Sequence, residues 1–477
     1  MKVLFCVSEC APIIKVGGLG DVAGSLPKAL ARLGVDIRIV VPKYEDIKTA
    51  EIKKLGETGV EFGGRKEKVV IWETILPDSK VPVYLLENET YLSKNGHQAF
   101  AGTEKETERF AFFSKSIAEL LITHNSSPIT IPDLLHLNDW HTSLIPLLLS
   151  NIYHPPSVLT IHNLSYQGIG SLGLLDKLGL KSDSCRVLKW DAENRDIDIL
   201  MEGIIHATFV NTVSPTYAKE IMTPQFGWGI EEVLKGKEGR VVGILNGIDY
   251  EVWNPTTDKF LDIRYQVSGI SQGKMGNKKF LQKELGLAVD EKIPLLAFVG
   301  RLEPQQKGLE ILLGAMEELL PKENFQFVLL GTGNKDWEEK YQVLSSKYQA
   351  NFKFICRFDE KLAHQLYASA DLFLLPSLFE PCGLPQMIGM RYGALPLVRK
   401  TGGLADTVKD GETGFVFEEY SSGALTETIE RAIKLSSNQE LWSKMVEDAM
   451  RQDFSWEASA REYLELYKEV IKLHNRE

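Results

Sequence analysis

The sequence predicts an α/β protein built from two doubly wound domains. Short apolar runs of strand length alternate with helical patterns along the whole chain, and this alternation is typical of parallel sheets covered by helices. The runs fall into two series, each long enough for one such domain. A chain of 477 residues, 44% of them hydrophobic, also has enough apolar surface for two cores. We therefore expect two domains that face one another across a cleft.

The order of these elements predicts the domain boundaries. The first series contains expected strands at residues 3–7, 36–41, 81–86, 134–137, 157–161 and 208–213, with helical stretches such as 20–33 and 108–121 between them. The second contains expected strands at 294–300, 326–331, 352–356, 372–376, 395–399 and 414–417. The series meet near residues 244–255, a segment punctuated by Gly, Asn and Pro. We expect domains at 1–245 and 246–455, and a final helix at 456–477 that crosses back to the first domain.

Composition narrows the classes of partner. The net charge of −11 argues against a nucleic-acid polyanion as the main partner. The N-terminal apolar run has only strand length and lacks a cleavage site, and no apolar stretch nears the span of a membrane helix. The cysteines are scattered without CxxC spacing, which favours reduced thiols over disulfides or zinc ligands; they are Cys6, Cys10, Cys185, Cys356 and Cys382. We expect a cytoplasmic protein that binds neither nucleic acid nor membranes.

Two similar glycine-rich phrases stand a domain apart, KVGGLGDV at residues 15–22 and KTGGLADTV at 400–408. Each follows an expected strand and leads into a helical pattern. Paired glycines at such a passage let the backbone approach a ligand and leave amides at a helix start for an anion, and Lys15 adds a mobile cation. The plainer interpretation of each pair is a tight turn, and the absence of GxGxxG disfavours a dinucleotide-binding loop. Two such loops suit a phosphate-linked ligand held from two sides.

Three charged residues follow expected strands of the second domain. Arg301 and Lys307 come after the strand at 294–300, where open α/β sheets bind their ligands. Together they can neutralise a diphosphate leaving group without a metal, whereas the plainer alternative is a pair of solvated surface charges. Glu380 follows the strand at 372–376 and can accept hydrogen bonds from sugar hydroxyls or stabilise cationic character at an anomeric carbon.

Other polar residues carry weaker signals. His162 follows the strand at 157–161, a good place for a ligand contact, although a lone histidine is more often packed or exposed. Cys382 has no histidine beside it and reads as a small packed thiol. The histidines lack metal-site spacing. Asp196 and Asp198 form a DxD pair in a polar segment, and we interpret them as solvated surface charges.

Eight motifs together resemble one family. In chain order they are KVGGLGDV, HLNDWH, TIHNLSYQG, TVSPTYAKEI, LNGID, QKG, FEPCGLPQ and KTGGLADTV. Over nearly the whole chain they resemble bacterial glycogen synthases and plant starch synthases. The resemblance implies the GT-B fold, with two Rossmann-like domains around a deep cleft. It also implies a retaining transfer of glucose from ADP-glucose to the non-reducing end of an α-1,4-glucan (glycogen, starch or malto-oligosaccharide), with release of ADP and without a cofactor or metal (EC 2.4.1.21). In a plant or alga the location would be the plastid stroma.

The resemblance implies roles for residues of the first domain. Lys15 and the backbone of Gly17 and Gly18 should meet the donor's phosphate side, and Asp21 should orient that loop and the sugar region. His162 should contact the glucose, with its backbone carbonyl near the developing oxocarbenium ion. Asp139 and Asn246 should make polar contacts with the substrate.

It also implies roles in the second domain. Arg301 and Lys307 should bind the diphosphate and stabilise departing ADP, and Glu380 should hold glucose hydroxyls. Phe358 aligns with an aromatic residue that stacks on adenine. The remaining expected substrate contacts come from the two flanking motifs and are Cys382, Gly383, Leu384, Thr401, Gly402 and Gly403.

The chain departs from the family pattern at three places. The loop between Arg301 and Lys307 is one residue longer than the usual RLxxQKG, Arg357 replaces a common Gly, and residues 187–204 match poorly in a region associated with the acceptor. The absence of a well-placed second carboxylate favours front-face displacement over a covalent double displacement. Two alternatives remain: a GT-B transferase that uses UDP-glucose or another acceptor, and a catalytically silent glucan-binding scaffold. The scaffold is disfavoured because every expected charged site residue is present.

Overall fold

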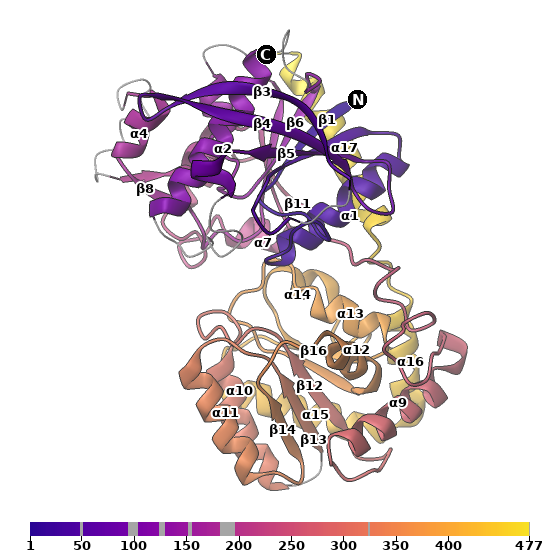
Figure 1. Ribbon diagram of the computed structural model, residues 1–477. Coiled ribbons are helices and arrows are strands. Elements are labelled where there is room, and N and C mark those ends of the chain that lie inside the picture. The colour runs from indigo at the N-terminus through magenta and orange to yellow at the C-terminus, as the bar shows by residue number, and fades with distance from the viewer. Residues whose placement is uncertain are drawn as a thin grey trace. The chain divides into compact units, whose positions relative to one another are not determined.

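The computed structural model describes residues 1–47, 51–93, 104–123, 129–150, 155–181, 196–322 and 325–476. The chain divides into two compact units. Unit 1 comprises Met1–Gly247 and Trp456–Glu477, and unit 2 comprises Ile248–Ser455. Figure 1 shows each unit as a layered α/β body in which helices cover a central sheet.

Unit 1 is built on a mainly parallel sheet. Its strands lie in the order β11-β10-β7-β6-β1-β2-β5-β4-β3, with all neighbours parallel except the β5–β4 and β4–β3 pairs. The bounds are β1 (Lys2–Cys6), β2 (Asp36–Pro42), β3 (Lys53–Phe62), β4 (Arg65–Ile75), β5 (Pro82–Glu87), β6 (Leu134–Asn138), β7 (Ser157–Ile161), β10 (Phe209–Thr212) and β11 (Val241–Gly243). A separate antiparallel pair joins β8 (Ile169–Ser171) to β9 (Asp196–Asp198).

Helices cover both faces of this sheet because its strands are apolar on both sides. In β1, Val3 and Phe5 belong to one core cluster, and Leu4 and Cys6 belong to the other. The first cluster contains residues of α1 (Gly18–Arg32) and α17 (Trp456–His474), and the second contains residues of α2 (Glu104–Ile122). The other helices of unit 1 are α3 (Ile145–Leu149), α4 (Gly173–Leu178), α6 (Ile199–His206), α7 (Pro215–Glu220) and α8 (Glu231–Lys235), with a π-helical turn η1 at Glu89–Ser93. This two-sided burial is the mark of a doubly wound sheet.

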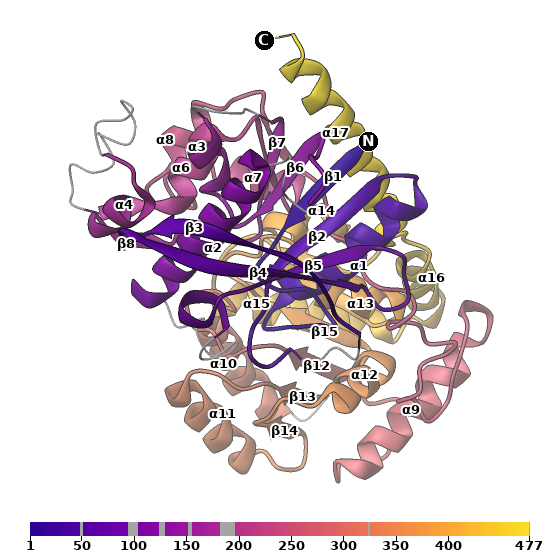
Figure 2. The ribbon, with the colours of Figure 1, turned by 45° about the horizontal axis from the view of Figure 1, so that its top comes forward.

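The last helix of the chain, α17, belongs to unit 1 and packs against α1 and β7, as Figure 2 shows. Its hydroxyl groups reach the sheet: Tyr467 Oη lies 2.6 Å from His136 Nδ1, and Asn211 Nδ2 donates to Tyr463 Oη over 2.9 Å. Ser459 Oγ donates to the carbonyl oxygen of Leu245. These contacts fix the helix over the centre of the parallel sheet.

Unit 2 has a fully parallel sheet with the strand order β14-β13-β12-β15-β16-β17. Numbered along the unit this is 3-2-1-4-5-6, the arrangement of a Rossmann domain. The strands are β12 (Leu295–Val299), β13 (Gln326–Leu330), β14 (Phe352–Ile355), β15 (Leu372–Leu375), β16 (Leu395–Arg399) and β17 (Phe415–Phe417). The helices are α9 (Ile270–Glu284), α10 (Leu309–Leu319), α11 (Lys335–Lys347), α12 (Glu360–Ser369), α13 (Pro385–Arg391), α14 (Gly402–Thr407), α15 (Ser422–Ser436) and α16 (Gln439–Met450), with 3₁₀ turns η4 (Val267–Gly269) and η5 (Leu320–Lys322).

The predicted fold class is confirmed. All twelve expected strands form, with ends shifted by a residue or two. The β3–β4 hairpin, which extends one edge of the sheet in unit 1 with antiparallel strands, is not predicted by the sequence pattern. Among the described helices, none combines the length and apolar character needed to span a bilayer. Cys185 and residues 187–195 of the segment 187–204 lie outside the described residues.

Candidate functional site

In unit 2, the expected charged residues gather at the carboxyl ends of β12 and β15. Arg301 follows β12 and is exposed. Lys307 lies in the turn before α10, and Glu380 lies after β15. The Lys307 Nζ atom is 2.7 Å from Glu380 Oε2, and both side chains are largely buried. The sequence placed these residues at one sheet edge, and the structure joins two of them in an ion pair.

Polar neighbours hold the Glu380 carboxylate in place. Ser377 Oγ donates to Oε2 over 3.0 Å, and Gln306 Nε2 lies 3.5 Å from Oε1. The backbone ties the two loops together, because Leu378 N donates to the carbonyl oxygen of Gln306 over 2.8 Å. Among the described residues, Oε2 carries two short contacts and Oε1 one long contact, so Oε1 keeps capacity to accept further hydrogen bonds.

The second glycine phrase lies directly against the Glu380 loop. Gly402 has a φ of 42°, and a Cβ atom there would lie 2.0 Å from the carbonyl oxygen of Glu380. A Cβ atom on Gly403 would lie 2.1 Å from the carbonyl oxygen of Cys382, and Gly403 N donates to the Glu380 carbonyl over 3.0 Å. The glycines are thus required by a close approach of two loops.

The residues beside this contact are mostly buried. Thr401, at the N-terminus of α14, and Cys382 are both buried, which agrees with a packed thiol. Gly383 has a φ of 75°, and Leu384 begins α13 in a half-buried position. Lys400, the lysine of the second phrase, forms an exposed ion pair with Glu418 at 2.6 Å.

Phe358 projects into solvent after β14. Its side chain is 88% exposed, the largest exposed fraction among the exposed large hydrophobic residues of the described chain. Arg357 is held by Asp359, whose Oδ2 accepts from Nε at 3.0 Å and from Nη2 at 2.8 Å. Asp359 also caps α12 by accepting from Leu362 N. The aromatic ring is therefore unburied while its neighbours are fixed.

In unit 1, the first glycine phrase wraps around Glu9, a residue that the sequence analysis missed. Glu9 follows β1 and is 5% exposed. Its carboxylate accepts from the backbone amides of Val16 and Gly17, the latter at 2.9 Å. Burial raises the pKa of Glu9, while the amides of Val16, Gly17 and Gly20 oppose that shift. The signal that the sequence offered was an acidic residue three positions after the end of β1.

Lys15 and Asp21 pair on the outer side of the same loop. The Lys15 Nζ atom lies 2.7 Å from Asp21 Oδ1, and both side chains are about half exposed. Gly18 starts α1, and a Cβ atom on it would meet nothing within 4 Å. The amide of Gly17 is already bonded to Glu9, whereas Lys15, Val16 and Gly18 are exposed.

His162 and Asp139 meet at the carboxyl ends of β6 and β7. Asp139 Oδ1 accepts from His162 N over 2.7 Å. The His162 Nε2 atom lies 3.0 Å from Asn138 Oδ1, while Asn138 Nδ2 donates to the carbonyl oxygen of Cys6. Because that carbonyl can only accept, the Asn138 oxygen faces the ring, Nε2 carries the proton, and Nδ1 is left as an acceptor.

Burial shifts the ionisation of both groups. It raises the pKa of Asp139 to about 7, with the negative charge of Glu9 adding to the rise and the amides of His162 and Asn163 opposing it. It lowers the pKa of His162 to about 3, so the ring is neutral at neutral pH. A neutral histidine with one fixed N–H suits hydrogen bonding to a sugar better than binding phosphate.

Asn246 follows β11 and is buried, and its Oδ1 atom has no hydrogen-bond partner among the described residues.

The interpretation of Asp196 and Asp198 as a solvated DxD pair needs correction. Asp198 is buried and caps α6 by accepting from Met201 N over 2.9 Å, so the pair is not a solvated surface pair. Across the part of the chain that the structure describes, no group of three or more His, Cys, Asp or Glu side chains is placed to hold a metal ion.

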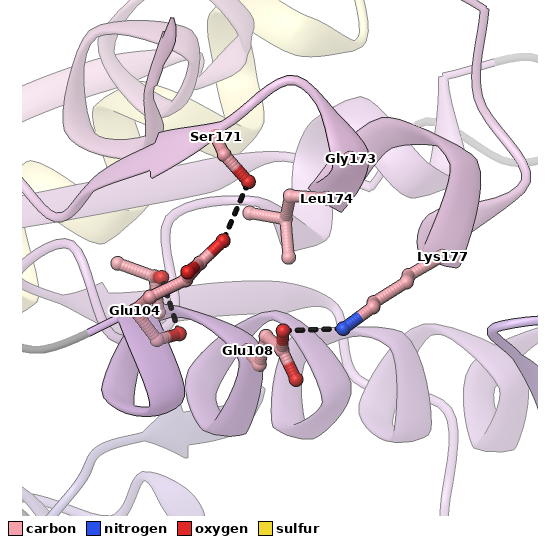
Figure 3. Close-up of a pocket in the computed structure, with 7 residues that line it drawn as sticks. Glu104, Glu108, Ser171, Gly173, Leu174 and Lys177 are labelled. Carbon is pink, nitrogen blue, oxygen red and sulfur yellow. Dashed lines mark hydrogen bonds and ion pairs between the residues drawn. The ribbon is translucent and has the colours of Figure 1, made fainter.

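A small cavity of about 80 Å³ in unit 1 lies beside α2 and α4 (Figure 3). Lys177 binds Glu108, and Ser171 Oγ donates to Glu104 Oε1 over 2.8 Å. Its polar groups bind one another, and no expected site residue lines it.

Comparison with known families covers both units. Residues 2–236 match the starch synthase catalytic domain family, and residues 279–451 match the family of glycosyl transferases group 1. The glycogen synthase of Bacillus subtilis (strain 168) is 41% identical over 489 residues, covering 99% of this chain and 99% of that protein. The glycogen synthase of Kosmotoga olearia is 42% identical over 480 residues, covering 99% and 98%.

Solved structures agree with these relatives. The catalytic domain of starch synthase IV from Arabidopsis thaliana, bound to ADP and acarbose, has a TM-score of 0.87 and 33% identity and covers 98% of this chain and 99% of its own. Sucrose-phosphate synthase from Thermosynechococcus elongatus, at 18% identity and a TM-score of 0.61 over 99% of both chains, shares the fold alone. The chain therefore belongs to the glycogen synthase and starch synthase family of GT-B glycosyltransferases.

Proposed function

We propose that the protein transfers glucose from ADP-glucose to the non-reducing end of an α-1,4-glucan, with retention of configuration at the anomeric carbon. The buried Lys307–Glu380 pair beside the exposed Arg301 carries the proposal, because it combines cations for a diphosphate with a carboxylate for a sugar at one sheet edge. The chain's family supports it, as does the starch synthase IV relative that was solved with ADP and acarbose.

Arg301 and Lys307 bind the diphosphate in this proposal. The guanidinium of Arg301 can donate two parallel hydrogen bonds to phosphate oxygens, and the Lys307 ammonium acts as a point charge. Negative charge grows on ADP as the glycosidic bond breaks. Cations placed in advance stabilise that charge more strongly than they stabilise the ground state, and so they lower the barrier.

Glu380 orients the glucose. Lys307 and Ser377 contact Oε2, so Oε1 is the oxygen that accepts from sugar hydroxyls. The Gly402 and Gly403 contacts hold the loop that carries this carboxylate, so these glycines act by positioning Glu380 as well as by approaching the donor. Thr401, Cys382, Gly383 and Leu384 complete the surroundings of the sugar.

Residues of unit 1 act on the same donor. The Lys15 ammonium binds a phosphate oxygen, and its ion pair with Asp21 weakens when it does so. The Nδ1 atom of His162 accepts a hydrogen bond from a glucose hydroxyl, since its Nε2–H is engaged by Asn138. The unpartnered Oδ1 of Asn246 accepts another. Asp139 holds His162 through the backbone and sets the position of the His162 carbonyl.

The reaction proceeds by front-face displacement in this proposal. The anomeric bond to the phosphate oxygen breaks, the acceptor hydroxyl bonds to the same face of the carbon, and its proton passes to the leaving phosphate. Asp139 holds the backbone at His162 in this proposal and is not a covalent nucleophile, because its Oδ1 atom already accepts from the His162 amide. The chemistry requires no metal, and full activity in excess EDTA is the expected result.

Donor choice tests the proposal most directly against its alternative, a UDP-glucose enzyme. We expect the exposed Phe358 ring to stack on adenine, a larger π-system than uracil. The measurement is kcat/KM for ADP-glucose and for UDP-glucose with glycogen as acceptor, and at least about a tenfold preference for ADP-glucose is expected. Proton NMR of the product should show new α-1,4 linkages. A strong preference for UDP-glucose would overturn the assignment of the donor.

A further inference from the structure

A large cavity in unit 2 lies away from the donor residues. It has a volume of about 670 Å³, within the range of small-molecule sites. Pro294, which precedes β12, and Asp371, which precedes β15, line it together with residues of α9, α15 and α16. Arg301 and Glu380 follow the same two strands at their other ends. The cavity is therefore at the amino-terminal edge of the sheet, opposite the proposed donor site.

One part of the cavity wall is apolar. Ile270 and Met275 of α9 contribute to it, as do Trp442 and Val446 of α16. Trp442 is half-buried, and its ring lies 6.2 Å from that of Phe415, so it is held in place. A fixed aromatic side chain beside aliphatic residues offers a surface for a ring-shaped ligand body.

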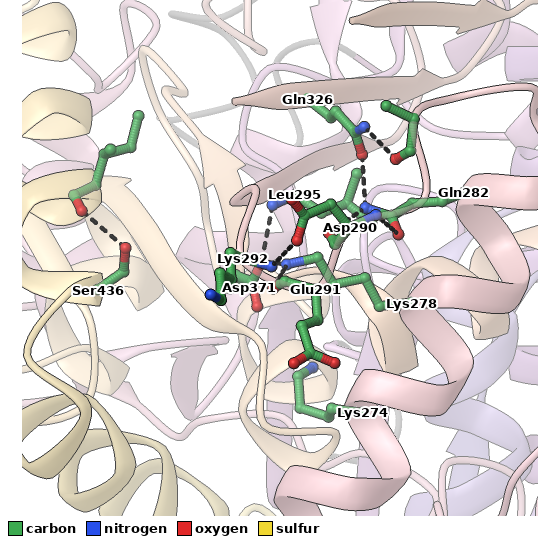
Figure 4. A network of polar contacts seen from close by, with 12 residues as sticks. Lys274, Lys278, Gln282, Asp290, Glu291, Lys292, Leu295, Gln326, Asp371 and Ser436 are labelled. Carbon is green, nitrogen blue, oxygen red and sulfur yellow. Dashed lines mark hydrogen bonds and ion pairs between the residues drawn. The ribbon is translucent and has the colours of Figure 1, made fainter. Parts of the chain in front are cut away.

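Lysines of α9 and of the loop before β12 supply the polar part (Figure 4). Lys278 is paired with a carboxylate of the wall, because its Nζ atom lies 2.6 Å from Asp371 Oδ2. Nζ also donates to the carbonyl oxygen of Glu291 over 3.0 Å. The other two carboxylates of the wall also have cations of their own. Glu291 pairs with Lys279 and Glu447 pairs with Arg451.

Lys274 differs from Lys278, because no carboxylate pairs with it among the described residues. Its Nζ donates to two backbone carbonyls over long distances, 3.2 Å to Tyr392 and 3.4 Å to Tyr367. An ammonium group has a third proton, which these bonds leave available. Lys292, the residue directly after Glu291, adds an exposed ammonium at the rim.

The charges of the wall and of its ion-pair partners do not cancel. Three lysines and three carboxylates line the cavity, but Lys279 and Arg451, which lie outside the wall, already pair with Glu291 and Glu447. Lys278 pairs with the third carboxylate, Asp371, so among the described residues Lys274 and Lys292 are left without a carboxylate partner. Burial lowers the pKa of Lys274 to about 7, with Lys278 lowering it further and Asp371 opposing the shift. A half-buried amine without a carboxylate partner gains from an anion that enters the cavity, because a nearby negative charge favours the ammonium form.

We propose that this cavity binds a small phosphomonoester carried on a ring, such as a sugar phosphate or a nucleoside monophosphate. The phosphate lies against Lys274 and Lys292, and the ring lies on the wall formed by Trp442 and Val446. A neutral oligoglucan would leave the excess positive charge unmatched, so the phosphate group is the feature that the site recognises. The site is separate from the transfer reaction and does not depend on the donor assignment.

Calorimetric titration of the full-length chain at pH 7 tests this inference. The probes are glucose 6-phosphate and AMP, which represent the two sources, with glucose, adenosine and inorganic phosphate as comparisons. At least one phosphomonoester should bind, and its neutral counterpart should bind at least about tenfold more weakly. Which of the two probes binds identifies the ring.

Three variants locate the binding. Lys274→Met removes the half-buried amine, and Lys292→Met removes an exposed one at little risk to folding; each should weaken binding about five- to tenfold. Arg301→Ala alters the donor site and should leave this affinity unchanged. Lys274→Met should also retain the wild-type rate of glucose transfer. The inference is overturned if neither phosphomonoester binds, if the neutral probes bind equally well, or if binding is lost in Arg301→Ala and kept in both lysine variants.

Discussion

At the residue scale, Asp139 combines an unusual backbone with an unusual ionisation. Its φ is 53°, in the left-handed region, and it is nearly fully buried while accepting the amide of His162. A strained conformation held by several contacts is typical of functional positions. The HLNDWH motif identified this residue, but the sequence could not indicate its raised pKa, which depends on burial and on Glu9.

The raised pKa of Asp139 predicts a pH-dependent stability. Burial raises the folded-state pKa from 3.8 to about 7, so this group's stabilising contribution is complete below pH 4 and is lost as the pH rises through 7. Asp139→Asn keeps an acceptor for the His162 amide and removes the titration. Between pH 5.5 and 8, the free energy of unfolding of the variant should therefore gain about 1–2 kcal/mol relative to the wild type. Urea unfolding at the two pH values measures this; a difference that does not change with pH would contradict it.

Glu9 is a residue of the candidate site that motif spacing in the sequence does not identify. Its role arises because the chain turns back after β1, with Cys10 and Ile14 forming an isolated bridge, so that the amides of Val16 and Gly17 meet a carboxylate several residues earlier. The glycine phrase predicted free amides for an anion. In the structure the Glu9 carboxylate accepts from the amide of Gly17 and so occupies the position of a bound anion. Whether a carboxylate of the chain reaches that amide depends on the path of the loop.

At the element scale, Gly402 sets how closely the β16–α14 passage approaches the Glu380 loop. Gly402→Ala should displace Glu380, because the new Cβ would lie 2.0 Å from a backbone oxygen and the φ of 42° disfavours alanine. We expect a loss of about 1–3 kcal/mol of stability and a larger loss of kcat/KM. The matched control is Gly423→Ala in α15, where a Cβ meets nothing within 4 Å. Equal rates for the two variants would show that the close approach is unimportant.

The elements that sequence reasoning predicted best are those buried on both sides. The strands of the parallel sheets form short continuous apolar runs such as Ser157–Ile161 and Leu372–Leu375. A run of this length and composition is typical of a strand that is buried on both faces. β3 (Lys53–Phe62) escaped prediction because it lies at an edge, with exposed charges and two glycines. Its pairing with β4 decides its conformation, and pairing is a tertiary property.

At the scale of the whole molecule, the C-terminal helix completes unit 1. Tyr467→Phe should remove the partner of a buried nitrogen, His136 Nδ1, and lower the free energy of unfolding by about 1–3 kcal/mol while kcat stays unchanged. The control is Tyr348→Phe, because no hydrogen bond through the hydroxyl of Tyr348 is found in the described chain. Thermal unfolding of both variants makes the comparison. A Tyr467→Phe protein as stable as the control would contradict the role of α17.

Lys15 in unit 1 and Glu380 in unit 2 both serve the proposed reaction, the transfer of glucose from ADP-glucose to a glucan. Initial rates of glucose incorporation into glycogen test it for Lys15→Ala and Glu380→Gln, with Lys400→Ala as the matched control. Lys400 occupies the same place in the second glycine phrase as Lys15 in the first, and it only pairs with Glu418 on the surface. Both site variants should remain folded and lose about 10²-fold or more in rate, whereas Lys400→Ala should match the wild type. Wild-type rates in both Lys15→Ala and Glu380→Gln would contradict the account.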